Sequence, residues 1–220
     1  MLILNLETAT KNCSVTLSKN GSVVLCKEIA EQGYSHAERL HIFIEEILKE
    51  AEISILDVKA IAVSKGPGSY TGLRIGVSAA KGLCYGLKIP LISIDTLTIL
   101  ARQISVEKGV IVPMIDARRM EVYSAVFNAN HQMIREVKAE ILTSESFTSF
   151  EQTIHFIGDS TEKAQTMLQQ SNFVFHDEIV YPSSREMSAL SFEKYQNNDF
   201  EDVAYFEPYY LKDFMPTSKI

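Results

Sequence analysis

The sequence predicts an α/β protein built from two related lobes. The chain of 220 residues is long enough for one large domain or two small ones. It opens with three strands that are followed by alternating helices and strands, and a similar block restarts near Gly109. We see no sequence repeat between the blocks, so the duplication is inferred from the order of elements alone. The predicted lobes span residues 1–108 and 109–220, and the last residues are candidates to pack back on the first lobe.

The first block has clear signals for each element. Residues 2–7 form a short apolar run, and apolar and polar residues alternate over 13–18, so both segments read as strands. Asn20-Gly21 supplies the positive φ values of a tight hairpin, which returns the chain over 23–29. Ser35 and Glu38 form a capping box, and apolar residues at three- and four-residue spacing follow through Ala51. Strands over 58–64 and 89–94 flank a small-residue helix over 72–87.

The second block repeats this order with weaker signals. We expect strands over 110–115, 121–127, 133–138 and 154–157. Helices are expected over 144–150, 160–170 and 186–197. The aromatic segment 208–212 is expected to pack on the body of the protein.

The charge of the chain excludes one function class. The chain carries 21 basic and 28 acidic side chains, a formal net charge of −7. Residues 1–110 hold 12 basic and 11 acidic side chains, whereas residues 111–220 hold 9 and 17. A protein that binds nucleic acid unaided needs a basic footprint, so we expect none of that activity here.

Location and redox state follow from what the sequence lacks. It has no basic leader with a long apolar stretch, and no uncharged apolar run of the ~18 residues that a transmembrane helix needs. Cys13, Cys26 and Cys84 are widely spaced and form no Cys-x-x-Cys pair, so buried reduced thiols are expected. We therefore expect a cytoplasmic protein without membrane contact.

The most informative stretch is the glycine loop, residues 65–76. It leaves a strand, turns through glycines and enters a helix, where free N–H groups favour an anion. The same glycines also suit a tight turn with unusual backbone angles, and both interpretations stay open. The spacing fits neither a Walker motif nor Gly-x-Ser-x-Gly, which leaves a serine hydrolase poorly supported. The candidate nucleotide-binding residues are Gly66, Gly68, Ser69 and Thr71.

The helix after this loop is rich in small residues. A glycine inside a helix costs about 0.5–1 kcal/mol relative to alanine, so such a helix suits close approach by another backbone. That backbone belongs either to the same chain or to a partner. With the helix ending at Ala51, this helix forms half of a predicted interface, and we expect Gly76→Leu or Ala79→Glu to disrupt association while sparing the fold. The candidate contact residues are Leu40, Phe43, Ile44, Ile47, Gly72, Ile75, Gly76 and Ala79.

Other residues that could carry chemistry have simpler interpretations. His36 and His41 are five apart, off the four-residue spacing of a helical metal pair, so no metal site is expected. Glu7 follows the first strand, and we favour an end-of-strand carboxylate over a metal or nucleotide ligand, because the turn after it lacks glycine. The Asp116-Ala117-Arg118-Arg119 turn could anchor a substrate, but ion pairing within the turn is the default.

Taken together, these residues resemble one family over nearly the whole chain. The resemblance is carried by 4–10 with 13–15, by the helix over 36–48, by Gly66-Pro67-Gly68-Ser69-Tyr70-Thr71-Gly72-Leu73-Arg74, by Asp116-Ala117-Arg118 with Glu121-Val122-Tyr123, and by Pro208-Tyr209-Tyr210-Leu211. The family is TsaB, also called YeaZ, the bacterial partner in making threonylcarbamoyladenosine in tRNA. The match is most specific in the glycine loop and weak from about 143 to 202.

The resemblance implies a two-lobed actin-like ATPase or ribonuclease-H-like fold, each lobe a mixed sheet with flanking helices. It implies a non-catalytic scaffold that needs no cofactor, binds a TsaD-like transferase together with a TsaE-like ATPase, and forms a homodimer when alone. The helices over 35–51 and 72–87 would form the interface, and tRNA would be reached only through the complex. Many members begin with Asp-Thr-Ala-Thr where this chain has Glu7. Two alternatives stay open: an actin-fold ATP- or ADP-binding kinase or ATPase acting alone, and a metal-dependent peptidase, which the histidine spacing disfavours.

Overall fold

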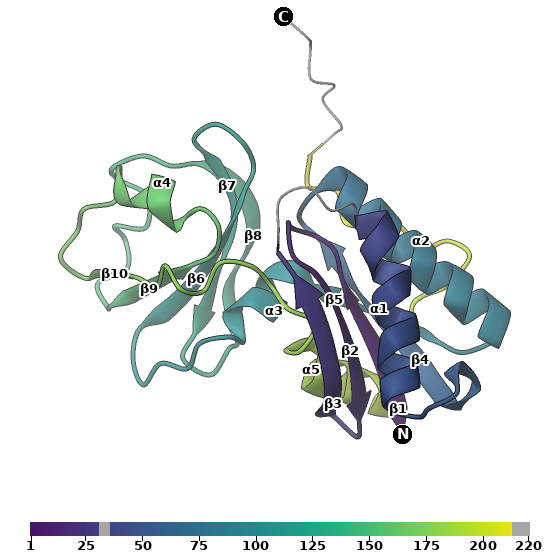
Figure 1. Cartoon of the computed structure of the whole chain (residues 1–220). Coiled ribbons are helices and arrows are strands. Elements are labelled where there is room, and N and C mark those ends of the chain that lie inside the picture. The colour runs from purple at the N-terminus through teal and green to yellow at the C-terminus, as the bar shows by residue number, and fades with distance from the viewer. Residues whose placement is uncertain (31–35, 213–220) are drawn as a thin grey trace, which may run out of the picture.

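The computed structural model describes residues 1–30 and 36–212, and it consists of two five-stranded sheets (Figure 1). The first sheet has the order β3-β2-β1-β4-β5. β1, β2 and β3 are antiparallel neighbours, and β4 and β5 run parallel to β1. The strands are β1 (Leu2–Glu7), β2 (Cys13–Lys19), β3 (Ser22–Ile29), β4 (Val58–Gly66) and β5 (Leu91–Asp95).

The second sheet repeats the first in topology. Its order is β10-β9-β6-β7-β8, with β6, β7 and β8 antiparallel and with β9 and β10 parallel to β6. Each strand of one sheet therefore has a counterpart at the same place in the other, and the predicted pair of related α/β lobes is confirmed. The strands are β6 (Val110–Asp116), β7 (Glu121–Asn128), β8 (Met133–Ile141), β9 (Ile154–Ile157) and β10 (Phe173–Phe175).

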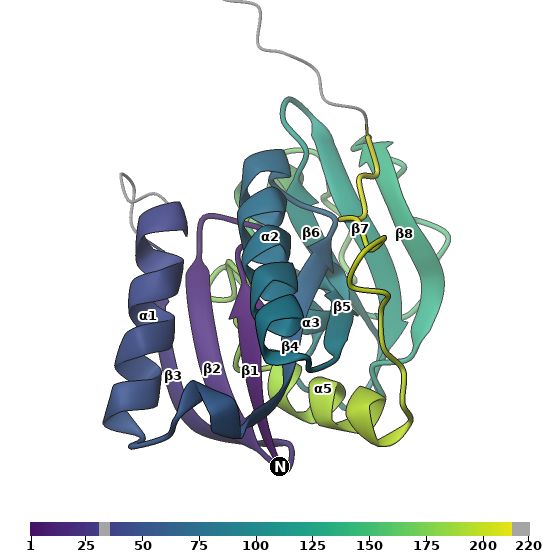
Figure 2. The same cartoon turned by 90° about the vertical axis from the view of Figure 1, so that its right-hand side faces the viewer.

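Helices cover both faces of the first sheet. α1 (His36–Glu50) and α2 (Tyr70–Leu87) lie side by side on one face, and α5 (Met187–Gln196) packs against β5 and β1 on the other (Figure 2). Successive residues of a strand point to opposite faces: Leu4 and Leu6 of β1 join the core under α1, whereas Ile3 joins the core under α5. The remaining helices are η1 (Ile55–Asp57), α3 (Thr96–Ala101) and α4 (Thr161–Gln165).

The first block matches its predicted elements closely, and the second does so less well. The helix expected over 144–150 is a series of turns, because Phe147 has a φ of 64°, which an α-helix excludes. The helix expected over 160–170 is only the short α4. Sequence reasoning missed β10, and also α3, whose N-cap is the carboxylate of Asp95. Ser35 of the expected capping box lies outside the described residues. No helix in the described part of the chain is long and apolar enough to span a bilayer.

Candidate functional site

The glycine loop joins β4 to α2 and packs against the turn between β1 and β2. Ser69 caps α2: its hydroxyl accepts the Gly72 N–H at 3.3 Å. The Ser69 N–H donates to the Ala9 carbonyl at 2.7 Å. The Thr8 hydroxyl donates to the Gly72 carbonyl, also at 2.7 Å. The start of α2 is thus bound by a turn some sixty residues earlier in the chain.

This contact explains why glycine occupies three of these positions. A β-carbon at Gly68 would approach the Ala9 carbonyl to less than 3.0 Å, one at Gly72 would do the same to the Thr8 carbonyl, and one at Gly76 to the Thr8 hydroxyl. A β-carbon cannot come this close to a backbone carbonyl or to a buried hydroxyl without a shift of the surrounding atoms. Of the two interpretations of the loop, the structure supports close packing within the chain.

The predicted nucleotide site remains a prediction. A phosphate at the start of α2 would compete with the Ala9 carbonyl, which already accepts the Ser69 N–H. Gly66 has a φ of 115°, and a β-carbon there would lie 2.6 Å from the Tyr209 carbonyl, so this glycine too has a reason within the fold. Thr71 is exposed on the first turn of α2.

Glu7 is the last residue of β1, and its side chain is hydrogen-bonded to the β1–β2 turn. One carboxylate oxygen accepts the Ala9 N–H at 2.5 Å. The side chain is fully buried, and this desolvation raises the pKa of Glu7 to about 7, although the Ala9 N–H partly offsets the rise. The Ser64 hydroxyl also favours the ionised carboxyl and lowers the pKa of Glu7, by less than burial raises it. Burying a charged carboxylate is costly, so Glu7 weakens the fold when it is ionised.

The predicted partner surface needs a correction, because most of its residues are buried within the chain itself. Leu40, Phe43, Ile44 and Ile47 face the first sheet and belong to its core. Gly72 and Gly76 are covered by the β1–β2 turn. The helical periodicity that marked these positions reflects the inward face of an amphipathic helix. The prediction of partner contact remains for Ile75 and Ala79, which are half-buried.

The outward face of α2 offers a different set of residues. It carries a stripe at three- and four-residue spacing, the pattern of one helix face. A β-carbon added at Gly82 or at Gly86 would have nothing within 4 Å of it. Tyr85 is 83% exposed, and Ile42 on the outward side of α1 is 43% exposed. The exposed residues of α2, which we call the α2 stripe, are Thr71, Arg74, Ser78, Gly82, Tyr85 and Gly86.

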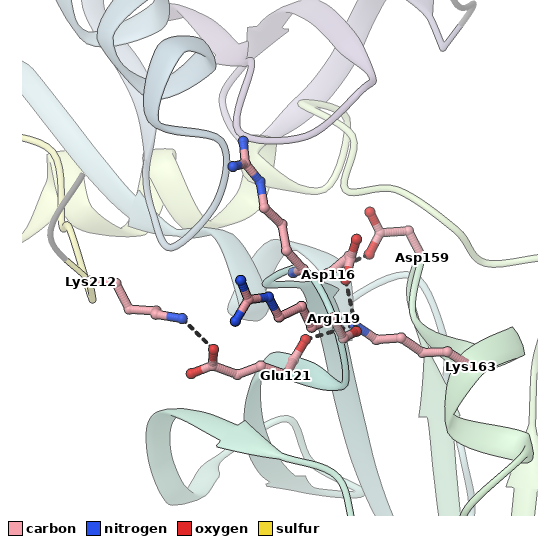
Figure 3. Close-up of polar contacts among 7 residues, drawn as sticks. Asp116, Arg119, Glu121, Asp159, Lys163 and Lys212 are labelled. Atoms are coloured by element: carbon pink, nitrogen blue, oxygen red, sulfur yellow. Dashed lines mark hydrogen bonds and ion pairs between the residues drawn. The ribbon is translucent and has the colours of Figure 1, made fainter. Parts of the chain in front are cut away.

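The turn between β6 and β7 forms a polar network at one end of the second sheet (Figure 3). Asp116 pairs with Lys163, and its N–H donates to the Asp159 carboxylate at 2.7 Å. Lys163 also donates to the carbonyls of Arg119 at 3.0 Å and Glu121 at 2.7 Å. The default expectation of side-chain ion pairs within the turn is therefore wrong, because the partner of Asp116 comes from α4.

Comparison with known proteins identifies the family. A family model described as TsaD, tRNA N6-adenosine threonylcarbamoyltransferase, matches residues 24–212. The whole chain aligns with 98% of the tRNA threonylcarbamoyladenosine biosynthesis protein TsaB of Escherichia coli (strain K12), at 28% identity. This chain belongs to the TsaB/YeaZ family. It also aligns in full with 97% of TsaB from Haemophilus influenzae, at 29% identity.

A solved TsaB/YeaZ structure supports the assignment. The structure titled YeaZ from Pseudomonas aeruginosa superposes with a TM-score of 0.83 over 96% of this chain and 99% of that one, at 25% identity. The actin-like, ribonuclease-H-like fold that the resemblance implied is confirmed by this match and by the two mixed sheets. TsaB/YeaZ proteins are therefore paralogues of the TsaD proteins, whose family model matches this chain.

Four of the five histidines of this TsaB/YeaZ chain contact protein atoms. The Nε2 atom of His36 lies 2.6 Å from the Thr10 carbonyl, and that of His131 lies 2.8 Å from the Ile104 carbonyl. His155 and His176 contact each other at 3.0 Å, and burial together with the charge of His176 lowers the pKa of His155. Within residues 1–30 and 36–212, no three His, Cys, Asp or Glu side chains are grouped to hold a metal ion.

The three cysteines are free thiols, and none is placed for chemistry. Cys13 and Cys84 are buried as expected, and desolvation raises the pKa of each to about 12. Cys26 is half-buried, and burial raises its pKa as well. A thiol with a raised pKa carries little of the reactive thiolate at neutral pH.

Sequence reasoning did not foresee how much the C-terminal segment does in this TsaB/YeaZ fold. The Tyr209 N–H donates to the Lys65 carbonyl at 2.7 Å, and Arg74 donates to the Tyr210 hydroxyl at 3.1 Å. The Tyr210 ring also lies 4.8 Å from the ring of Tyr70. The expected packing of this aromatic segment is confirmed, and its position beside the glycine loop is new. Only the run of aromatic residues after Pro208 could have signalled it.

Proposed function

We propose that this chain is a non-catalytic accessory subunit in the formation of threonylcarbamoyladenosine in tRNA. In this role it binds a TsaD-like transferase, and a TsaE-like ATPase joins the pair. Membership of the TsaB/YeaZ family supports the pathway, since the relatives carry that biosynthesis in their names. The observation that carries the binding role is the α2 stripe, because two of its glycines have no neighbour within the chain.

The α2 stripe has the properties of a surface that another backbone approaches. Each glycine in a helix interior costs about 0.5–1 kcal/mol relative to alanine, and nothing packed around Gly82 or Gly86 in the chain offsets this cost. A partner helix that packs directly on the stripe would offset it. Tyr85 lies between the two glycines, and a large exposed aromatic side chain is a typical anchor of an interface. We infer that the same surface forms the homodimer when the partner is absent.

The experiment pairs one substitution on the stripe with a matched control. Gly82→Glu adds a bulky charge at a site with open space, so the isolated chain should fold normally but lose co-purification with the TsaD-like protein of its own organism. Ala189→Glu makes the same addition of charge at an exposed position of α5, on the opposite face of the sheet, and should keep the partner. Retention of the partner by a folded Gly82→Glu variant would remove the stripe from the interface.

The pathway itself is tested in cells. Depletion of the protein should lower threonylcarbamoyladenosine among the tRNA nucleosides measured by mass spectrometry. Wild type and Ala189→Glu should restore it, whereas Gly82→Glu should not. Unchanged nucleoside levels after depletion would rule out the proposed function.

No cofactor enters this proposal, and ATP or ADP at the glycine loop is a separate prediction. Gly68→Val is a poor test of it, because a side chain at this position would collide with the Ala9 carbonyl and disturb the fold. Thr71→Ala is a better test, because Thr71 is exposed. Saturable ATP binding by the isolated chain that weakens in Thr71→Ala would favour the alternative of an ATPase acting alone.

A further inference from the structure

The turn between β6 and β7 presents two adjacent arginines in a fixed but unfavourable backbone conformation. Arg118 and Arg119 have φ values of 71° and 54°, in the left-handed region that non-glycine residues seldom adopt. Each such residue costs on the order of 1 kcal/mol and persists only where its surroundings hold it. Both side chains are exposed at the tip of the turn.

Lysines pair with two of the carboxylates around this turn. Asp116 pairs with Lys163, and Glu121 pairs with Lys212 of the C-terminal segment. The Asp116 carboxylate also accepts the Arg118 N–H at 3.0 Å. Lys163 also donates to the backbone carbonyls of Arg119 and Glu121, so its side chain holds the backbone of the turn as well as the Asp116 carboxylate.

Both guanidinium groups of this turn therefore remain available to bind a ligand. Among the described residues, no hydrogen bond or ion pair reaches the guanidinium of Arg118 or of Arg119, and Figure 3 shows Arg119 with no contact drawn to its tip. What distinguishes these two arginines from the other exposed cations is the turn that holds their backbone in place. Guanidinium groups match the oxygens of phosphates and carboxylates.

Two adjacent arginines on one rigid turn suit a ligand with more than one negative charge. Phosphate groups fit this better than a single carboxylate does.

The exposure of the turn decides between small and large phosphate ligands. Small-molecule ligands are held in concave sites that cover most of their surface. Two hollows of the described surface, of about 340 and 560 Å³, are lined by other residues and include neither Arg118 nor Arg119. A nucleic-acid backbone, by contrast, is contacted at its phosphates by exposed cations and needs no pocket.

We propose that Arg118 and Arg119 contact backbone phosphates of RNA. The proposal rests on the proposed function, in which a tRNA is the substrate of the complex. It revises the expectation that this chain reaches tRNA only through its partner. Since residues 111–220 carry 17 acidic and only 9 basic side chains, the contact adds a few phosphates to a site whose main positive surface belongs to the partner.

The test compares two double variants that remove the same charge. Asn tolerates the left-handed region, so R118N/R119N keeps the turn while it removes both guanidinium groups. K19N/K59N removes two exposed lysines from the first sheet and serves as the control. Binding of a labelled, unmodified tRNA transcript is measured at several salt concentrations, for the full chain alone and for the chain co-purified with its TsaD-like partner.

We expect R118N/R119N to weaken RNA binding about 10-fold and to lower the slope of log K against log salt by about 1–2. The control should shift the affinity less than about 2-fold by the same reasoning. Equal binding by wild type and R118N/R119N, in both preparations, overturns the proposal. So does an equal loss in the control, because the effect would then be one of net charge alone.

Two further measurements distinguish RNA binding by these arginines from nucleotide binding and from the proposed partner-binding function. If millimolar ATP binds the chain and R118N/R119N abolishes that binding, the arginines serve a nucleotide and the RNA assignment is overturned. Co-purification with the partner is scored for every variant. Failure of the wild type to hold the partner would count against the proposed function, whereas arginine-dependent RNA binding by the chain alone would still stand.

Discussion

The two halves of α2 use glycine for opposite reasons. In the first half, Gly72 and Gly76 lie against Thr8, and a β-carbon at either would collide with it. In the second half, Gly82 and Gly86 face open space. A small residue is kept in a helix where another backbone comes close. For the first half that backbone is in the same chain, and for the second half we propose that it belongs to a partner.

The contrast changes one expectation drawn from the sequence. The small-residue pattern predicts that Gly76→Leu breaks association and spares the fold, but Gly76 is buried against the Thr8 hydroxyl. We now expect damage to the fold from Gly76→Leu, and the test of association moves to Gly82.

The largest effect is expected from Gly72→Ala. The added methyl group would overlap the Thr8 carbonyl, a backbone atom that cannot rotate away. The substitution would also disturb the hydrogen bond from the Thr8 hydroxyl to the Gly72 carbonyl. We expect a loss of about 3 kcal/mol in the free energy of unfolding, at the upper end of overpacking effects. Urea unfolding of the isolated chain measures it, and a loss below about 0.5 kcal/mol would contradict the packing described.

Glu7, beneath the same turn, should make the stability depend on pH. Its pKa is about 7 in the folded protein and 4.5 in the unfolded chain, so the folded state holds the proton more tightly. Stability from this group is complete below about pH 4.5 and is lost as pH rises through about 7, by up to about 3 kcal/mol. Glu7→Gln should remove that loss, so that its unfolding curves at about pH 5 and pH 8.5 differ less than those of wild type. Parallel pH profiles for the two proteins would refute this role.

A double-mutant cycle separates side-chain from backbone collisions in the first half of α2. Thr8→Ala alone removes a buried hydrogen bond and should cost about 1–2 kcal/mol. It also removes the hydroxyl that a β-carbon at Gly76 would meet, after which the nearest atoms lie at 3.5 Å. Gly76→Ala should therefore cost about 1–2 kcal/mol less in the Thr8→Ala background. Gly72→Ala should be rescued less, because the Thr8 carbonyl still blocks its β-carbon and only the shared hydrogen bond is already lost in Thr8→Ala. Additivity in the Gly76 pair would contradict the contacts.

The sequence predicts where the helices and strands lie better than it predicts which helix face packs on the chain itself and which is free for a partner. Spacing alone locates α1 and α2, because periodicity reports which residues share a side. Periodicity does not say whether that side meets the chain's own sheet or a partner, so the pattern alone places Leu40 and Ile47 on the wrong surface. The role of Gly72 depends on Thr8, a contact between residues 64 positions apart, which no local pattern encodes.

The second lobe shows the same limit in its polar residues. The Asp116 turn is visible as a motif, but Lys163 and Lys212, which neutralise its carboxylates, come from α4 and from the C-terminal segment. Local spacing favours pairing between Asp116 and its neighbouring arginines. Only the fold shows that the pairs lie elsewhere and that the arginines stay available.

The smallest and most diagnostic effect is expected from Gly82→Ala. Because nothing in the chain lies within 4 Å of the added methyl group, only the helix propensity of the monomer changes. The chain, kept dilute enough to be monomeric, should gain about 0.5–1 kcal/mol. If a partner backbone packs on the α2 stripe, the same methyl group should weaken association, so stability and partner affinity would move in opposite directions. Urea unfolding and a binding titration with the TsaD-like protein measure the two. A gain in stability with unchanged affinity would mean that Gly82 is not where the partner approaches, and the contrast between the two halves of α2 would then lose its explanation.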